Sequence, residues 1–201
     1  GTWARSARVR WPRPLPWPEA SAARARVVSR VAGDAHEAAR IRAHPITVSR
    51  NHAAPPWLVL TGGVGIGKSH LAEVAARELA GRGERVRWQP VGELLDRLRL
   101  DVANSGNDEN AFAHLAAVAA TPWLVLDDLG KTKPTGWVLE TLYMLINSRT
   151  VRRMRTLITT NDTLPELTAK LGDAIADRVF DTHSGLTAVV TLSGPSFRTG
   201  R

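Results

Sequence analysis

A glycine-rich turn between an apolar strand and a helix constrains this chain more than any other feature of its sequence. The segment "LVLTGGVGIGKSHLAEV" spans residues 58–74 and has the spacing Gly62-x4-Gly67-Lys68-Ser69. This spacing fits a phosphate-binding loop, in which glycines let successive backbone N–H groups face a polyphosphate without a Cβ in the way. The first turn of the following helix adds unpaired amides and the positive end of its dipole.

In that geometry Lys68 is expected to reach the β and γ phosphates of a nucleotide, and the Ser69 hydroxyl to coordinate Mg²⁺. The alternative is an ordinary glycine-rich turn ahead of a surface helix. An apolar strand expected upstream and an apolar helical stripe downstream favour the phosphate loop. The expected nucleotide-binding residues are Gly62, Gly63, Val64, Gly65, Ile66, Gly67, Lys68, Ser69 and His70.

The rest of the chain alternates strands with helices. Further strands are expected at 85–91, 123–126, 156–161 and 187–192, and helices at 92–100, 109–120, 136–153, 163–171 and 173–180, in addition to the helix that ends near Gly81. This alternation is typical of a parallel sheet with right-handed crossovers. The 201 residues therefore predict one α/β domain, a three-layer sandwich around a central parallel sheet, with a short appendage.

That appendage is a basic arm over residues 1–56, ahead of a domain at 57–201. The arm has ten arginines and three acidic residues, so it accounts for +7 of the formal net charge of +8. Trp3, Trp11 and Trp17 lie among prolines, which predicts an extended segment, and 19–43 reads as one or two helices. We expect the tryptophans to dock a protein partner; the alternatives are single-stranded DNA, a solvated arm, or tryptophans folded onto the domain's own surface.

Composition excludes several classes of site. The chain has no cysteine, which rules out disulfides and thiolate zinc sites, and its six histidines show no paired metal-ligand spacing. No apolar run approaches the ~20 residues of a membrane span, and no signal peptide is visible. We therefore expect a cytoplasmic protein without a membrane partner.

Polar residues follow two of the expected strands. Asp127 and Asp128 come directly after the apolar run 123–126, at the strand end where α/β sheets bind ligands. Asp127 fits the acid that holds Mg²⁺ through water, and Asp128 the neighbour that orients or deprotonates an attacking water. Asn161 ends "TLITTN" and fits a contact to that water or to the γ-phosphate. The alternatives are helix-capping aspartates and a turn-forming asparagine before Asp162.

Four segments together resemble a known family: "GGVGIGKSHLAEVAARELAGRGERVRW", "WLVLDDLGKTKPTGWVLETLYMLINSR", "TLITTN" and "LGDAIADRVFD…GPSFR". They are similar to the AAA+ ATPase domain of bacterial helicase loaders of the DnaC/DnaI type, whose relatives include the IstB transposition ATPases. The resemblance covers roughly 57–198. It implies that Gly62 to Ser69 form the Walker A motif and Asp127-Asp128 Walker B, that Asn161 is sensor 1, Arg178 the arginine finger and Arg198 sensor 2.

The resemblance also implies a function. We expect an ATPase that uses ATP and Mg²⁺, forms a homo-oligomer through its ATPase domain, and delivers the replicative DNA helicase onto single-stranded DNA. Alternatives are an IstB-like transposition ATPase that coats duplex DNA and recruits a transposase, and a non-hydrolysing ATP-gated adaptor. The stretch "DDLGKTKPTGWVLETLY" looks closer to the loaders.

Three departures from the family pattern shape these expectations. AAA+ ATPases usually carry glutamate where Asp128 stands, so hydrolysis is expected to be slow. The sequence ends just after Arg198, so we expect no C-terminal helical lid. The basic arm does not match a zinc-bearing loader N-terminal domain.

Two arginine assignments have structural alternatives. A forked, permanently charged guanidinium suits a transferring phosphoryl group. From the residues alone, however, a salt bridge between Arg178 and Asp173, Asp177 or Asp181 is favoured over an arginine finger. The arginines of "SRTVRRMR", residues 148–155, lie near the C-terminus of an expected helix. They are expected to compensate the helix dipole rather than to contact DNA.

Overall fold

Five parallel strands form the centre of the domain. The computed structural model describes residues 55–106, 108–194 and 196, and its sheet has the order β2-β3-β4-β1-β5. The strands are β1 (Trp57–Gly62), β2 (Val86–Pro90), β3 (Trp123–Leu129), β4 (Arg155–Thr160) and β5 (Thr187–Leu192). Every neighbouring pair is parallel. The predicted parallel α/β fold is confirmed.

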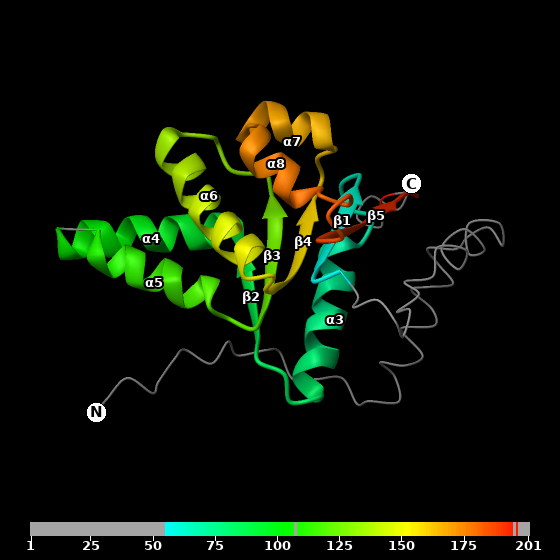
Figure 1. Cartoon of the computed structure of the whole chain (residues 1–201), viewed down its shortest axis with the longest axis horizontal. Helices are drawn as coiled ribbons and strands as arrows, with labels where there is room; N and C mark the ends of the chain where they lie inside the picture. The colour runs from blue at the N-terminus through cyan, green and yellow to red at the C-terminus, as the bar shows by residue number, and fades with distance from the viewer. Residues whose placement is uncertain (1–54, 107, 195, 197–201) are drawn as a thin grey trace. The chain divides into compact units, whose positions relative to one another are not determined.

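Six helices connect these strands in the described part of the chain (Figure 1). They are α3 (Lys68–Gly81), α4 (Val91–Ser105), α5 (Glu109–Ala119), α6 (Gly136–Val151), α7 (Leu164–Leu171) and α8 (Asp173–Val179). Helix α4 continues five residues beyond the expected 92–100 because Asp101 and Val102 still pack inwards; it stops at Gly106, whose φ of +69° is left-handed. None of these helices is long and apolar enough to cross a membrane.

Helices cover both faces of the sheet, which makes three layers. On one face, Leu60, Val125 and Leu157 pack against Ala72 and Ala76 of α3. The opposite faces of the same strands contribute to a larger core with α4, α5, α6, α7 and α8. Because both faces are buried, the central strands β1 and β3 begin as continuous apolar runs rather than as alternating ones.

Parallel pairing brings the expected site residues to one edge. The register pairs Leu60 with Thr159, so the loop after β1 starts beside the end of β4. The loop after β3 leaves the sheet at the same edge, where arrowheads of β3 and β4 point towards α7 and α8 in Figure 1. The basic arm expected over 1–56, including Trp3, Trp11 and Trp17, lies almost wholly outside the described residues.

A buried arginine ties the opposite edge of the sheet together. Arg149 of α6 is 0% exposed, and its Nη1 donates to the carbonyl oxygens of Ala119 and Thr121, both at 2.8 Å. Its Nη2 donates to the carbonyl of Arg155 at 2.6 Å and its Nε to Thr156 Oγ1 at 2.9 Å. Burial lowers the pKa of Arg149 to about 10, so the guanidinium is charged at neutral pH. One side chain therefore links the end of α5 with the starts of β3 and β4.

Replacing this arginine is expected to destabilise the domain. Arg149→Gln leaves buried carbonyls without donors, which should lower the free energy of unfolding by about 3 kcal/mol. Urea unfolding followed by circular dichroism measures the loss. The control is Arg152→Gln, an exposed site directly after α6, where the change should stay within about 0.5 kcal/mol. Equal effects at the two sites would show that Arg149 does not hold this edge.

Candidate nucleotide-binding site

The loop between β1 and α3 has a backbone that glycine alone adopts readily. Gly62, Gly65 and Gly67 have φ angles of +134°, +79° and +94°. A Cβ on Gly62 would lie 2.2 Å from the carbonyl oxygen of Leu192. Successive amides in such a conformation form a concave anion site, and the loop runs directly into the first turn of α3. The loop therefore has the backbone that a bound phosphate group requires.

Lys68 lies at the centre of this loop. Its side chain is buried, and Nζ donates to the carbonyl oxygens of Gly62 at 2.8 Å and Gly63 at 2.7 Å. A third bond, of 2.6 Å, runs to Oδ1 of Asn161. The structure thus brings together a lysine and an asparagine that are 93 positions apart in the sequence. Asn161 therefore contacts Lys68. It also stands directly before Asp162, where the alternative prediction placed a turn-forming asparagine.

The other loop residues differ in exposure. Gly63, Val64 and His70 are exposed, whereas Ser69 is half-buried in the first turn of α3. Ile66 is buried, with its side chain directly beneath Gly62. The open side of the loop thus offers backbone amides and small side chains to solvent.

Asp127 and Asp128 lie at the end of β3 and are held by a threonine whose role the sequence did not predict. Thr159 Oγ1 donates to Asp127 Oδ1 at 2.6 Å and accepts from the backbone N–H of Asp128 at 2.9 Å. The β3–β4 register shifts between Leu126 and Leu129, and Asp128 has a φ of +60°. Asp128 Oδ2 forms an ion pair with Lys131 Nζ at 3.1 Å. The two carboxylates therefore have different environments.

The start of α7 is tied to the same strand ends. Thr61 Oγ1 donates to the carbonyl oxygen of Asp162 at 2.9 Å, and Lys170 Nζ bonds to Asp162 Oδ1 at 2.6 Å. Thr160 Oγ1 donates to the carbonyl oxygen of Leu129 at 2.7 Å. These bonds fix the backbone on both sides of Asn161. Threonines at strand ends were the only sequence signal for this network.

Arg178 lies in α8, and its observed contacts are with residues of α6 and α8. Its Nε donates to Asn147 Oδ1 at 3.2 Å, its Nη1 donates to the carbonyl oxygen of Ala174 at 2.5 Å, and its guanidinium lies 5.1 Å from the centroid of the Tyr143 ring. Within the described ranges it has no ion pair, so the predicted alternative of a salt bridge is not observed. Arg198, the other expected catalytic arginine, lies outside the described residues.

The donor set decides which cation suits this edge. Among the residues with described positions, no three His, Cys, Asp or Glu side chains gather into a metal site. Ser69 and Asp127 are the expected ligands, so a cation here would need oxygens from phosphate and water as well. Mg²⁺ is commonly bound in this way, because it keeps several waters and adds substrate phosphates. The residues present therefore fit an Mg–nucleotide better than a bare metal ion.

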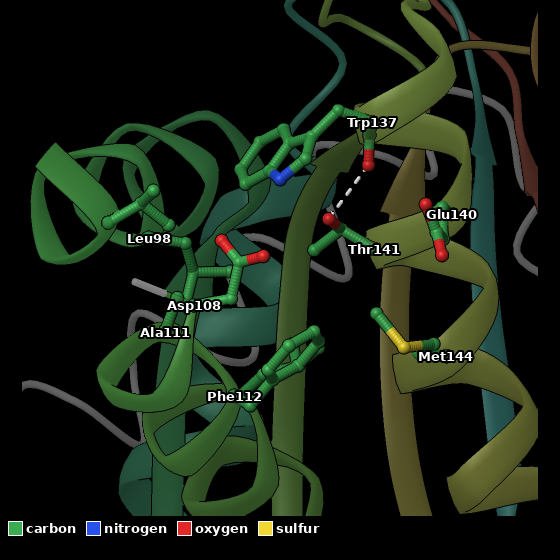
Figure 2. Close-up of a pocket in the computed structure, with 10 residues that line it drawn as sticks. Leu98, Asp108, Ala111, Phe112, Trp137, Glu140, Thr141 and Met144 are labelled. Carbon is green, nitrogen blue, oxygen red and sulfur yellow. Dashed lines mark hydrogen bonds between the residues drawn. The ribbon is translucent and has the colours of Figure 1, made fainter. Parts of the chain in front are cut away.

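A separate pocket of about 120 Å³ lies between α4, α5 and α6 (Figure 2). Leu98, Phe112, Trp137 and Met144 line it together with Asp108 and Glu140. An adjoining hollow of about 240 Å³ is bordered by Arg99, whose guanidinium lies 5.1 Å from the centroid of the Trp137 ring. Phosphate-loop residues line neither hollow. The candidate nucleotide site is therefore the open loop itself and not a preformed cavity.

Comparisons with known proteins agree with this geometry. The model of the family described as IstB-like ATP binding protein matches residues 50–201. An ATP-binding protein of an insertion sequence in Mycobacterium tuberculosis is 27% identical over 162 residues, covering 77% of this chain and 62% of that protein. The replicative helicase loader DnaC of Escherichia coli is 26% identical over 121 residues, covering 60% of this chain and 49% of the loader. The chain thus spans less than two thirds of either relative.

Solved structures share the fold. The crystal structure of the DnaC helicase loader has a TM-score of 0.60 at 24% identity and covers 79% of this chain and 89% of its own. AMPPCP-bound DnaA from Aquifex aeolicus has a TM-score of 0.60 at 16% identity, with coverage of 79% and 48%. With a family match that includes every described strand and helix, the chain belongs to the IstB-like ATP binding protein family and has the fold of an AAA+ P-loop domain.

Proposed function

We propose that this chain is an ATPase whose nucleotide state controls delivery of a replicative DNA helicase onto single-stranded DNA. The observation that carries the proposal is the bond from Lys68 Nζ to Asn161 Oδ1. A phosphate bound in the loop would compete for the same ammonium group and so change the surroundings of Asn161. Asn161 is followed by Asp162, which Lys170 links to α7. Nucleotide binding can thereby alter a helix at the domain surface.

The residues of the site have distinct proposed tasks. The backbone of 62–69 and the Lys68 ammonium hold the phosphates, and Ser69 and Asp127 hold Mg²⁺, which when bound would offset the phosphate charge. Asp128 orients the attacking water and accepts its proton. Its side chain is one methylene shorter than glutamate and already engages Lys131 through one oxygen. Both properties support slow hydrolysis.

Arg178 supports a site completed by a neighbouring copy of the chain. Its partners in its own molecule, Asn147, Tyr143 and the carbonyl of Ala174, are all uncharged. The charge is therefore available to a phosphate held by another subunit, as an arginine finger is. This arrangement requires the chain to form a homo-oligomer.

A transposition ATPase is the second candidate. The family match and the insertion-sequence relative, which is aligned over more of this chain than DnaC is, both favour it. In that role the ATPase would coat duplex DNA and recruit a transposase. The proposed role in helicase delivery is supported by the sequence similarity to DnaC.

Lysine 68 provides the first test. Lys68→Ala should reduce binding of a fluorescent ATP analogue, with Mg²⁺ present, to background, because the only lysine in the loop is lost. The control is Lys133→Ala, which removes the same charge from an exposed site outside the loop. Equal binding by wild type and Lys68→Ala would mean that the loop is an ordinary turn.

Mixed oligomers test the role of Arg178. Arg178→Ala and Lys68→Ala should each abolish turnover, since arginine fingers contribute about 10³–10⁵ in rate in other phosphoryl-transfer systems. Mixing the two variants should restore part of the ATPase activity, at interfaces where an intact loop meets an intact arginine. A mixture no more active than its two components excludes action in trans.

Partner choice separates the two candidate functions. We expect the host's replicative helicase to co-purify with the full chain in a way that depends on ATP, and Lys68→Ala to remove that dependence. Retention of the insertion-sequence transposase on duplex DNA, with no helicase retained in either nucleotide state, would replace the first function with the second.

A further inference from the structure

The amino ends of the strands carry a cluster of arginines that the proposed chemistry does not use. Arg85 precedes β2, Arg155 begins β4, and Arg152 and Arg153 lie between α6 and β4; all four are exposed. We call these four residues the basic edge. It lies at the opposite end of the sheet from the phosphate loop, away from α7 and α8 in Figure 1.

Trp123 organises the centre of the basic edge. Its backbone N–H donates to the carbonyl oxygen of Arg85 at 3.2 Å, and it is directly paired with Arg155 in the sheet register. The Arg155 guanidinium lies 4.8 Å from the centroid of its indole ring. Neighbouring strands are ~4.8 Å apart, so the backbones of Arg85 and Arg155 lie on the two sides of Trp123, and the Arg155 side chain stacks on its ring. Stacking of this kind holds a guanidinium in place while its N–H groups stay free to bind an anion.

Pairing distinguishes these arginines from others on the surface. Arg77, Arg82, Arg97 and Arg99, on or next to α3 and α4, each form an ion pair with a carboxylate three or four residues away. In the described part of the chain, no ion pair involves a member of the basic edge. Of these four arginines, only Arg153 donates a side-chain hydrogen bond to another described residue, from Nη2 to the carbonyl oxygen of Gly185 at 3.2 Å.

Among the described residues, few acidic groups lie near these arginines. Glu84 is the exposed neighbour of Arg85, and the half-buried Asp181 precedes β5. The Asp181 carboxylate accepts bonds from the backbone N–H and hydroxyl of Ser184, and these bonds lower its pKa. Like charges gathered on one surface repel one another, and a bound anion relieves that repulsion.

We propose that the basic edge binds the phosphodiester backbone of DNA. Its arginines lie at the starts of β2 and β4, on the two sides of β3, which suits a row of phosphates better than one compact anion. The inference rests on the proposed function in that it assumes the chain acts on DNA. It adds where the phosphates lie: on the sheet edge remote from the nucleotide, so both ligands can bind the same molecule.

The test compares two variants that each remove two positive charges. Arg85→Gln/Arg152→Gln changes the basic edge at side chains with no hydrogen bond or ion pair in the described structure. Arg77→Gln/Arg82→Gln changes two arginines that are paired with carboxylates. Affinity of the full chain for fluorescent oligothymidylate is measured across a salt series, with thermal unfolding of each variant to verify its fold.

We expect the basic-edge variant to lose about 25-fold in affinity near 0.1 M salt. The negative slope of the log association constant against log salt should become less steep by about 1.4, the value for two lost single-strand contacts. The paired-arginine variant should bind nearly as wild type does. Arg85→Lys/Arg152→Lys keeps the charges and should restore most of the affinity. Repeating the series with duplex DNA identifies the source of the phosphates, since a loss confined to duplex assigns the basic edge to duplex.

Three results would overturn the inference. The two double variants could lose affinity equally, which would indicate a general effect of net charge. DNA binding could be unchanged by the basic-edge variant, which refutes this surface and leaves the proposed function intact. Wild type could bind neither form of DNA, which refutes the DNA partner in the proposed function and this surface with it.

Discussion

Hydrogen bonding between β1 and β4 is the constraint on which the candidate site depends. The two strands are about a hundred residues apart in the chain, and their parallel register runs from Trp57 with Thr156 to Leu60 with Thr159. A slip of one residue would turn every side chain of a strand to the other face of the sheet. The observed register brings the Lys68 ammonium to Asn161. Buried apolar side chains on both faces, rather than the polar residues themselves, hold this register in place.

The two edges of the sheet are held by different side chains: threonines at the carboxyl edge and a buried arginine at the amino edge. At the carboxyl edge, Thr159, Thr160 and Thr61 bond strand ends to one another and set the directions of Asp127 and Asn161. At the amino edge, Arg149 bonds carbonyls from three segments. Each edge therefore has a rigid frame of its own. In consequence, ligands at one edge need not disturb the other.

Local sequence predicted the elements well because each depends on neighbouring residues. The spacing of glycines around Lys68 and the apolar runs at 57–60 and 123–126 were sufficient for the loop, the strands and their parallel arrangement. The missed features all depend on register between distant segments. Nothing in "SRTVRRMR" distinguishes the buried Arg149 from the exposed Arg152, and nothing in "TLITTN" shows that Thr159 faces Asp127. The proposed roles of Arg178 and Arg198 came from family resemblance alone.

The backbone at Asp128 affects which residue can stand there. Its φ of +60° lies in the left-handed region, where aspartate and asparagine occur several-fold more often than other side-chain-bearing residues. Glutamate lacks the short side chain that bonds to nearby backbone and eases this conformation. The bulge near the end of β3, where the Asp128 N–H bonds to Thr159, thus favours aspartate over glutamate at this position, even though aspartate reaches less far towards a water. The rate of the proposed ATP hydrolysis would then be set partly by the conformational preference of the main chain, so that faster variants would first have to reshape the strand end.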